Sequence, residues 1–302
     1  MGRTNTIDVG IVGLDTSHSE RFAAVIEARE DATVAGVWDG GAVRDAEYVD
    51  SFCEEYRADR YGEPEAMVGE VDAAMVLTVN WDRHRPIAEA LLEGGVPTFL
   101  DKPIAGTAAD VEAIRAATER TGVPVCGGSA VPYHPAVSEM RTDTGVHDLF
   151  VAGYNGPFYY GVHLADVTRL ICGTDWTRIE PADHTAATTV TFEDGSTATV
   201  RFDGPTEDAA FGLLDVGSAV RTAYIDSSER TLERMYEPFI ESFVRAASGG
   251  PDHRGWLFDA ATLILGVQAV LESDVSITPE SPELYDVVED GTAFTEEYRP
   301  LY

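Results

Sequence analysis

The strongest constraint on the fold is an alternation of short apolar runs with helix-like runs through the first 125 residues. The apolar runs cover residues 7–14, 33–39, 73–79, 96–102 and 123–128. They are nearly continuous, as expected for strands buried on both faces of a sheet. Strands that alternate with helices pair in parallel, because each helix carries the chain back across the sheet. Residues 1–125 are therefore predicted to form a doubly wound parallel sheet.

The pattern changes after about Gly128. Polar and apolar residues alternate through 188–202, on either side of Asp194 and Gly195, which predicts an antiparallel hairpin. Residues 211–226 resemble further strand, and helical patterns cover 163–173, 233–247 and 255–273. Residues 126–302 are therefore predicted to be a second, C-terminal α+β domain.

The charge balance is strongly acidic, with 53 Asp and Glu residues against 21 Lys and Arg, a net charge of −32. Such a surface repels nucleic acid and anionic lipid, so neither is expected as a partner. We find no basic-then-apolar leader and no apolar run of membrane-span length. Dispersed acidic charge with almost no lysine is typical of a salt-rich cytoplasm, which predicts a halophile's protein. Three widely separated cysteines indicate reduced thiols and no metal site.

The loop after the first predicted strand stands where doubly wound sheets bind their ligands. Gly13 fills the first place of a G-x-G-x-x-G dinucleotide motif, but Asp15 and His18 occupy the second and third. A carboxylate at the second place would repel a pyrophosphate. Two interpretations stay open: Asp15, Thr16 or Ser17 caps the following helix, or the loop binds phosphate. The cofactor contacts predicted here are Gly13, Asp15 and Thr16.

Polar residues also follow the second and third of these strands. Asp39 is placed to hydrogen-bond ribose hydroxyls and to repel a 2′-phosphate, which favours NAD over NADP, although a solvated loop acid would look the same. Asn80 and His84 stand at the same edge and are further predicted cofactor contacts. For Asn80, local turn and cap bonding explains the residue equally well.

Lys102 is the only lysine in 302 residues and follows the next strand, between Asp101 and Pro103. Arginine stays charged at any working pH, whereas a desolvated lysine can exchange a proton near neutrality. A lysine at this position therefore predicts an acid/base role. Pro103 fixes the turn, and the bond before it is a candidate cis peptide.

Four segments, in this order and spacing, resemble the glucose–fructose oxidoreductase / inositol dehydrogenase / MocA (Gfo/Idh/MocA) family: GIVGL with Asp39, VNWDRH, GGVPTFLDKPIA and GVHLADVTRLICG. The family's Glu-Lys-Pro appears as Asp101-Lys102-Pro103, which the resemblance places beside the cofactor. The resemblance implies an N-terminal Rossmann domain and a C-terminal domain with a largely antiparallel open sheet. It also implies hydride transfer between NAD(P) and a sugar, polyol or cyclitol hydroxyl, in a homodimer or homotetramer.

The family's G-x-H-x-x-D stretch appears as Gly161, His163 and Asp166. The resemblance implies that His163, helped by Lys102, removes the hydroxyl proton, and that Asp166 orients His163 from the same helix face. Tyr159 holds a place where members commonly have aspartate, and its phenol is a candidate donor. Because the glycine motif and this aspartate are both altered, an idle dinucleotide- or metabolite-binding protein on the same fold is the alternative.

Overall fold

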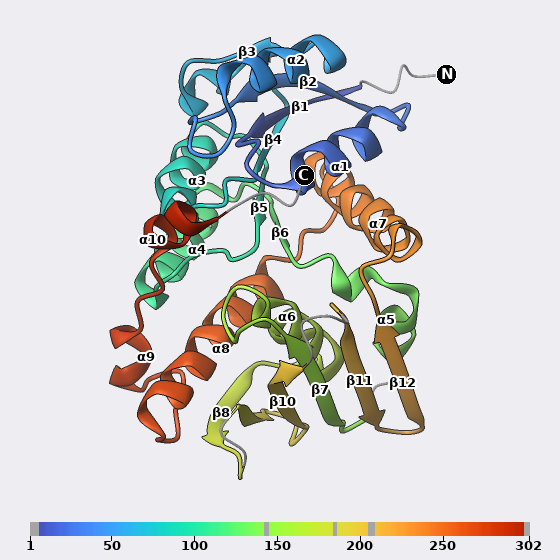
Figure 1. Ribbon diagram of the computed structural model, residues 1–302, viewed down its shortest axis with the longest axis vertical. Helices are drawn as coiled ribbons and strands as arrows, with labels where there is room; N and C mark the ends of the chain where they lie inside the picture. The colour runs from blue at the N-terminus through green and yellow to red at the C-terminus, as the bar shows by residue number, and fades with distance from the viewer. Residues whose placement is uncertain (1–5, 142–144, 184–185, 205–208, 299–302) are drawn as a thin grey trace.

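The computed structural model of the chain describes residues 6–141, 145–183, 186–204 and 209–298. Two six-stranded sheets lie at opposite ends of the molecule, and helices fill the space between and around them (Figure 1). The core residues of the two sheets and of these helices form one continuous hydrophobic cluster.

The first sheet is entirely parallel, in the order β3-β2-β1-β4-β5-β6. Its strands are β1 (Ile7–Val12), β2 (Ala32–Trp38), β3 (Asp59–Arg60), β4 (Ala73–Val76), β5 (Thr98–Asp101) and β6 (Val125–Gly128). The direction of winding reverses between β1 and β4, which opens a crevice at the carboxyl ends of these strands. The predicted doubly wound parallel sheet is confirmed.

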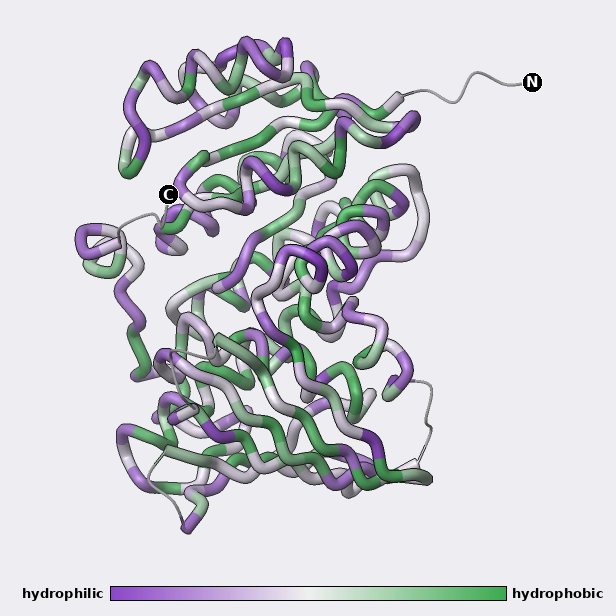
Figure 2. The backbone as a smooth tube through the Cα atoms, turned by 45° about the vertical axis from the view of Figure 1, so that its right-hand side comes forward, coloured by the Kyte–Doolittle hydropathy of each residue, from purple (hydrophilic) through white to green (hydrophobic). Residues whose placement is uncertain are grey.

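Helices connect these strands and bury one apolar face each. They are α1 (Ser17–Glu27), α2 (Ala46–Tyr56), α3 (His84–Glu93) and α4 (Ala108–Thr121), with the short helices η1 (Pro64–Met67) and η2 (Trp81–Arg83). Figure 2 shows the upper helices alternating between hydrophilic and hydrophobic residues, as a helix with one buried face requires. The strand predicted at 73–79 ends at Val76. Residues 77–79 instead form part of the loop at the crevice.

The second sheet has the order β12-β11-β7-β10-β9-β8 and is antiparallel except for the pair β7 and β10. Its strands are β7 (Asp148–Tyr154), β8 (Trp176–Pro181), β9 (Ala187–Phe192), β10 (Thr197–Gly204), β11 (Phe211–Val216) and β12 (Val220–Ile225). The predicted hairpin is confirmed by the pairing of β9 with β10, which turns at Asp194 and Gly195. The predicted C-terminal domain with a largely antiparallel sheet is confirmed.

Helices cover one face of this second sheet and leave the other open (Figure 1). The helical elements after β6 are η3 (Val131–Tyr133), α5 (Pro135–Met140), α6 (Gly161–Cys172), α7 (Glu229–Ala247), α8 (Arg254–Ser273), α9 (Pro282–Asp286) and α10 (Gly291–Glu297). By length and composition, α8 is the one helix in the described part of the chain that passes as a membrane span, with a mean hydropathy of 1.3. Because 67% of that stretch is buried, it has the properties of a core helix.

Two helices of the C-terminal half return to the first domain. Helix α7 packs against α1, with the rings of Phe22 and Tyr236 edge to face at 5.1 Å. Helix α10 lies against η2, where the Asp82 carboxylate accepts hydrogen bonds from the backbone and hydroxyl of Thr292 at 2.9 and 3.0 Å. The predicted boundary at 125/126 thus falls inside β6, the last strand of the first sheet, and residues of the C-terminal half also cover the first domain.

Candidate active site

The loop after β1 is pressed against the loop after β4. Gly13 has φ of +94°, and a Cβ added there would lie 2.6–2.9 Å from atoms of Thr78, so only glycine fits. Its backbone N–H donates to the Trp38 carbonyl at 2.7 Å. The backbone of this loop can therefore approach a ligand at the crevice closely.

Helix α1 begins with its first turn facing a cavity. Thr16 is the N-cap, and its hydroxyl accepts a hydrogen bond from the His18 backbone N–H at 3.2 Å. Of the capping residues considered from the sequence, Thr16 is the one that caps. Thr16, Ser17 and His18 also line the cavity, so the positive end of the helix dipole is directed at it.

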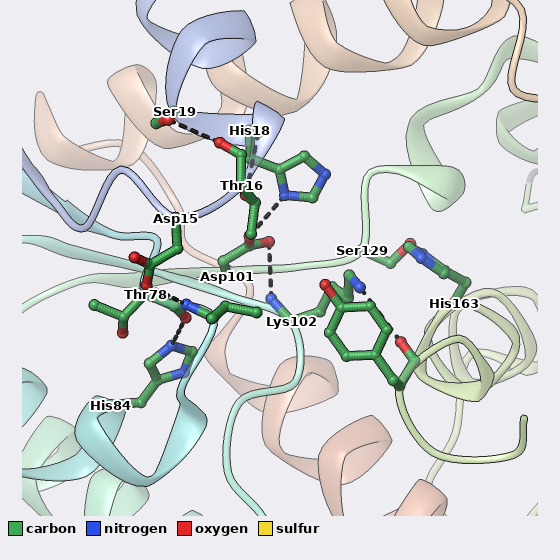
Figure 3. Close-up of polar contacts among 12 residues, drawn as sticks. Asp15, Thr16, His18, Ser19, Thr78, His84, Asp101, Lys102, Ser129 and His163 are labelled. Atoms are coloured by element: carbon green, nitrogen blue, oxygen red, sulfur yellow. Dashed lines mark hydrogen bonds and ion pairs between the residues drawn. The ribbon is translucent and has the colours of Figure 1, made fainter. Parts of the chain in front are cut away.

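Asp15 turns away from this cavity. Its side chain is buried, and Oδ2 accepts a hydrogen bond from the Val79 backbone N–H at 2.9 Å (Figure 3). Burial raises the pKa of Asp15 to about 6. Asp15 thus links the β1 and β4 loops, and its predicted contact with a cofactor stays a prediction.

Asp39 lies at the end of β2, as predicted, and holds the glycine loop. Its carboxylate accepts hydrogen bonds from the backbone N–H groups of Leu14 and Gly41, each at 2.8 Å. A carboxylate has about four lone-pair sites, so these two bonds leave acceptor capacity for a further donor. The side chain is partly exposed.

Asn80 and His84, both predicted cofactor contacts, make structural contacts at this edge of the sheet. Asn80 caps η2, with Oδ1 accepting from the Asp82 backbone N–H at 3.0 Å. His84 is fully buried, and its Nε2 and Nδ1 contact the carbonyls of Thr78 and Ile104 at 2.9 and 3.2 Å. Burial lowers the pKa of His84, and the ring lies between the β4 loop and the segment after Lys102.

Lys102 follows β5 and is 8% exposed. The Lys102–Pro103 peptide bond is cis, as the sequence suggested. The Nζ atom lies 3.3 Å from the centroid of the Tyr159 ring and donates to the Tyr159 carbonyl at 3.3 Å. Burial lowers the pKa of Lys102 to about 8, although the Asp101 charge opposes this shift. The amine therefore exchanges its proton near physiological pH.

Asp101 and His18 form a contact that the sequence did not predict. His18 Nδ1 lies 2.6 Å from Asp101 Oδ2, and Asp101 Oδ1 accepts from the Lys102 backbone N–H at 2.9 Å (Figure 3). Burial alone would raise the pKa of Asp101, but the adjacent His18 and Lys102 lower it below its ordinary value. Asp101 is thus an anion that joins the start of α1 to the end of β5.

His163 is held through Ser129, which the sequence analysis missed. Ser129 Oγ lies 2.6 Å from His163 Nδ1 (Figure 3). The Ser129 backbone N–H donates to Asp166 Oδ2 at 2.5 Å. Asp166 therefore orients His163 indirectly, not by the direct contact predicted. Burial raises the pKa of Asp166 to about 8 and, together with the charge of Lys102, lowers the pKa of His163 well below its ordinary value. At neutral pH the imidazole is uncharged.

Tyr159 supports Lys102 through its ring and its backbone. The ring stacks on Phe294 of α10, with centroids 4.5 Å apart. Burial raises the pKa of the phenol well above its ordinary value, so Tyr159 stays neutral. Tyr159 thus contacts both Lys102 and helix α10 through its ring.

A cavity of about 550 Å³ lies between the two domains. Of the predicted residues, four line it: Thr16, Lys102, Tyr159 and His163. The others do not line it: Gly13, Asp15, Asp39, Asn80, His84, Asp101, Pro103 and Asp166. The far wall comes from α7 and α10. Within the described ranges, no group of three or more His, Cys, Asp and Glu side chains is arranged to hold a metal ion.

Residues 7–129 match the family model described as "Oxidoreductase family, NAD-binding Rossmann fold" (GFO_IDH_MocA). A UDP-N-acetylglucosamine 3-dehydrogenase from Acidithiobacillus ferrooxidans is 27% identical over 157 residues, 52% of this chain and 43% of that protein. A myo-inositol dehydrogenase from Streptomyces leeuwenhoekii is 38% identical over 84 residues, 26% of each chain. The matched segments thus span less than half of these two relatives.

Solved structures show the same fold at low sequence identity. GenD2 from gentamicin A biosynthesis, solved with NAD, superposes with a TM-score of 0.77 at 15% identity, covering 93% of this chain and 98% of that one. A scyllo-inositol dehydrogenase from Lactobacillus casei, solved with NAD(H) and scyllo-inositol, has a TM-score of 0.75 at 14% identity, covering 92% and 100%. Both sheets of the chain are therefore of a known two-domain architecture. Residues 7–129 are thus similar to the Gfo/Idh/MocA oxidoreductase family, with its NAD-binding Rossmann fold.

Proposed function

We propose that the chain is an NAD-dependent dehydrogenase that moves hydride between nicotinamide and a hydroxyl-bearing carbon of a sugar, polyol or cyclitol-like substrate. The observation that carries the proposal is the convergence of Lys102, with a pKa near 8, and neutral His163 on the cavity that the start of α1 also faces. A proton-exchanging amine and a neutral imidazole, beside a helix start suited to phosphate, are the arrangement that alcohol oxidation needs.

The residues at the crevice fit a dinucleotide. Gly13 leaves room for close backbone approach, and the α1 first turn faces the cavity. The carboxylate of Asp15, which the sequence placed against the pyrophosphate, is instead occupied by Val79. We propose that the backbone of Gly13 to Ser17 holds the pyrophosphate, with Asp101 and Lys102 nearer the reacting end.

Asp39 supports NAD in preference to NADP. Its two hydrogen bonds to backbone N–H groups fix the carboxylate at the end of β2, beside the glycine loop. The remaining acceptor capacity suits the ribose hydroxyls, while the negative charge opposes a 2′-phosphate.

We assign the proton to Lys102 rather than to His163. Burial first, and then the charge of Lys102, depress the pKa of His163, because protonating it would place a second positive charge in a buried site. The amine of Lys102 has a pKa near 8 and is therefore the better acceptor at working pH. His163, fixed at Nδ1 by Ser129, would use Nε2 to hydrogen-bond and orient the same hydroxyl.

In this scheme the O–H bond of the substrate breaks, its proton passes to Lys102 Nζ, and the oxygen becomes a carbonyl oxygen. The chemistry that nicotinamide supplies when bound is acceptance of the hydride from the same carbon. Tyr159 and Phe294 exclude water on one side of the amine, because their stacked rings cover it. Reduction runs through the same groups in reverse.

The substrate class follows from the cavity and from the relatives. The cavity is lined by hydroxyl-bearing and aromatic side chains together with Asp226 and Glu297. Carboxylates and phenols bind the hydroxyl groups of carbohydrate-like molecules, and aromatic faces pack on their C–H faces. The relatives named above are a nucleotide-sugar dehydrogenase and an inositol dehydrogenase.

We further propose a homo-oligomer, a dimer or tetramer, built on the open face of the second sheet. Phe150 and Leu214 are direct cross-strand partners on this face, and they remain 40% and 38% exposed. Tyr224 on the edge strand β12 is 66% exposed. A contiguous exposed apolar surface of this kind favours contact with another protein surface.

The charge of −32 and the three free cysteines support a reducing, salt-rich cytoplasm as the compartment. In high salt the repulsion between acidic side chains is screened, which permits a surface of this composition.

The experiment is a screen of polyols, cyclitols and nucleotide sugars with NAD at molar KCl, in which reduced nicotinamide is followed by its absorbance. NAD binding is titrated separately by fluorescence. We expect binding without substrate and turnover with at least one compound of this class. Binding without any turnover would favour an idle dinucleotide-binding protein, and absence of binding would overturn the proposal.

A further inference from the structure

A second cavity, of about 440 Å³, lies between α4, α6 and the start of α8, and it shares no lining residue with the candidate active site. Four arginines line it, each from a different part of the chain: Arg115, Arg141, Arg169 and Arg254. From these side chains and the donors described below, we infer that the cavity binds the phosphate group of a small phosphorylated metabolite.

The charge around this cavity differs from that of the rest of the chain. Overall the chain has 53 acidic residues against 21 basic ones. At the cavity four arginines meet four carboxylates, namely the lining Glu119 and Asp175 and the arginine partners Asp252 and Asp259. A place where the charges balance, in a molecule that otherwise repels anions, opposes an anion least.

Two of the arginines are held in place by carboxylates. Arg169, itself only 8% exposed, bonds to Asp175 and Asp259. Arg254 bonds to Asp252 through Nε at 2.6 Å. These ion pairs fix the guanidinium groups in position before any ligand arrives, which lowers the entropy lost on binding.

Two further donors on residues of the cavity wall have no partner. Among the described residues, the buried Nε of Arg115 and the buried indole Nε1 of Trp256 donate no hydrogen bond, and Arg115 forms no ion pair. Buried polar groups are normally hydrogen-bonded, so these two donors of the cavity wall lack an acceptor. An indole N–H and a guanidinium can only donate, so the acceptor has to be an oxygen-rich group.

The start of α8 adds further donors. His253 provides no side-chain cap, and Arg254, Gly255 and Trp256 all line the cavity. The first backbone N–H groups of an α-helix have no acceptor within the helix, and the dipole of this 20-residue helix favours an anion there.

A phosphate monoester fits this set of donors better than a carboxylate. A single guanidinium can satisfy both oxygens of a carboxylate through a bidentate pair. Here donors come from three helices, which suits the three free oxygens and the double charge of a phosphate monoester. The cavity is also larger than a bare ion needs, and Leu170 and Phe258 give it an apolar wall for an organic body. Glu119 and Asp175 can accept hydrogen bonds from hydroxyl groups on that body.

The test is calorimetric titration of the full chain with three probes: glucose 6-phosphate, inorganic phosphate and gluconate. Arg115→Gln and Trp256→Phe remove the unpaired donors with little change in volume. The matched control is Arg120→Gln on the same helix, because Arg120 is exposed and pairs with Glu93 outside the cavity. Melting temperatures of all variants show whether they fold.

We expect glucose 6-phosphate to bind with a stoichiometry of one at this cavity and more tightly than the other probes. Arg115→Gln should weaken it about tenfold, as loss of a charge-assisted hydrogen bond does, Trp256→Phe should weaken it less, and Arg120→Gln should leave it unchanged. Tighter binding of gluconate or of inorganic phosphate would overturn the ligand class. Equal binding by Arg115→Gln and Arg120→Gln would overturn the site, since any phosphate bound at α1 of the active site persists in both.

Discussion

Lys102 Nζ lies 3.3 Å from the centre of the Tyr159 ring. At the sequence position of Tyr159, the family that the chain resembles commonly has an aspartate. A carboxylate so close to the amine would hold its pKa high by direct charge attraction. An aromatic face attracts the ammonium more weakly, so burial prevails and the pKa of Lys102 is lowered to about 8. The replacement of aspartate by Tyr159 thus favours, rather than removes, acid/base chemistry at this lysine.

The pH dependence of oxidation follows from this pKa. Lys102 accepts a proton only as the neutral amine, so kcat/KM for oxidation should rise as the pH passes through about 8, and the rate of reduction should fall over the same range. Steady-state rates in both directions across this range measure the effect. Lys102→Met should abolish the rise of kcat/KM with pH. Tyr159→Phe, which keeps the ring and the backbone carbonyl, should leave the pH midpoint of this rise unchanged. If the rise persists in Lys102→Met, another group is titrating.

Lys102→Arg tests whether a positive charge alone suffices. Arginine is bulkier and keeps its proton at any working pH, so it cannot accept one from the substrate. Turnover should fall by roughly 10²–10⁴-fold, the usual contribution of positioned proton transfer. The affinity for NAD, titrated by fluorescence, should change much less. Turnover equal to that of the wild type would show that Lys102 is not the proton acceptor.

Asp166→Asn should stabilise the protein at alkaline pH. The carboxyl is buried, and its pKa is raised from 3.8 to about 8, so between these values the folded chain keeps a proton that the unfolded chain has released. The stability of the wild type therefore declines as the pH rises through this window. Asparagine keeps an oxygen for the Ser129 N–H but carries no charge. We expect a gain on the order of 2 kcal/mol at pH 8 over pH 4 in urea denaturation. A variant less stable than the wild type at both pH values would refute the buried, protonated state.

Asp39→Asn separates the charge of Asp39 from its hydrogen bonds. The amide oxygen can still accept from Leu14, so the glycine loop keeps its shape. The loss of charge removes the repulsion of a 2′-phosphate, and we expect the preference for NADH over NADPH to fall about tenfold. Parallel fluorescence titrations of both nucleotides measure this ratio. Tighter binding of NADPH than of NADH by the wild type would contradict the assignment directly.

The net charge predicts a requirement for salt. At millimolar ionic strength the repulsion among acidic side chains acts over tens of ångströms, and molar KCl confines it to about 3 Å. The melting temperature from circular dichroism should therefore rise with KCl, by about 2–4 °C for each kcal/mol of stability regained. Potassium sulfate at matched ionic strength serves as a second salt. A melting temperature independent of salt would argue against the salt-rich compartment.

The parts of the site that could be predicted from the sequence are those set by strand ends. Lys102 and Gly13 stand directly after apolar strands of a parallel sheet, and all such ends meet at one edge. His163 was assigned through the motif that it shares with Gly161 and Asp166. The structure confirms that His163 and Lys102 line one cavity.

The remaining contacts depend on side-chain directions that no local pattern encodes. His18 and Asp101 are 83 positions apart, and nothing around either residue signals the other. Asp15 looked like an obstacle because its loop position suggested an outward carboxylate, whereas the backbone turns it toward Val79. Ser129 follows β6 without any motif, and its role appears only when α6 is packed beside it.

The return of α10 to the first domain has a consequence for biosynthesis. Phe294 and Tyr298 form part of the cavity wall, and Asp82 holds the start of α10 through Thr292. The first domain can form its sheet while the ribosome is still translating the second, but Lys102 stays uncovered until residue 298 has left the exit tunnel. The first sheet of a nascent chain can therefore fold before the cavity around Lys102 is complete. A truncation before α10 should leave a native-like sheet whose crevice is open to solvent.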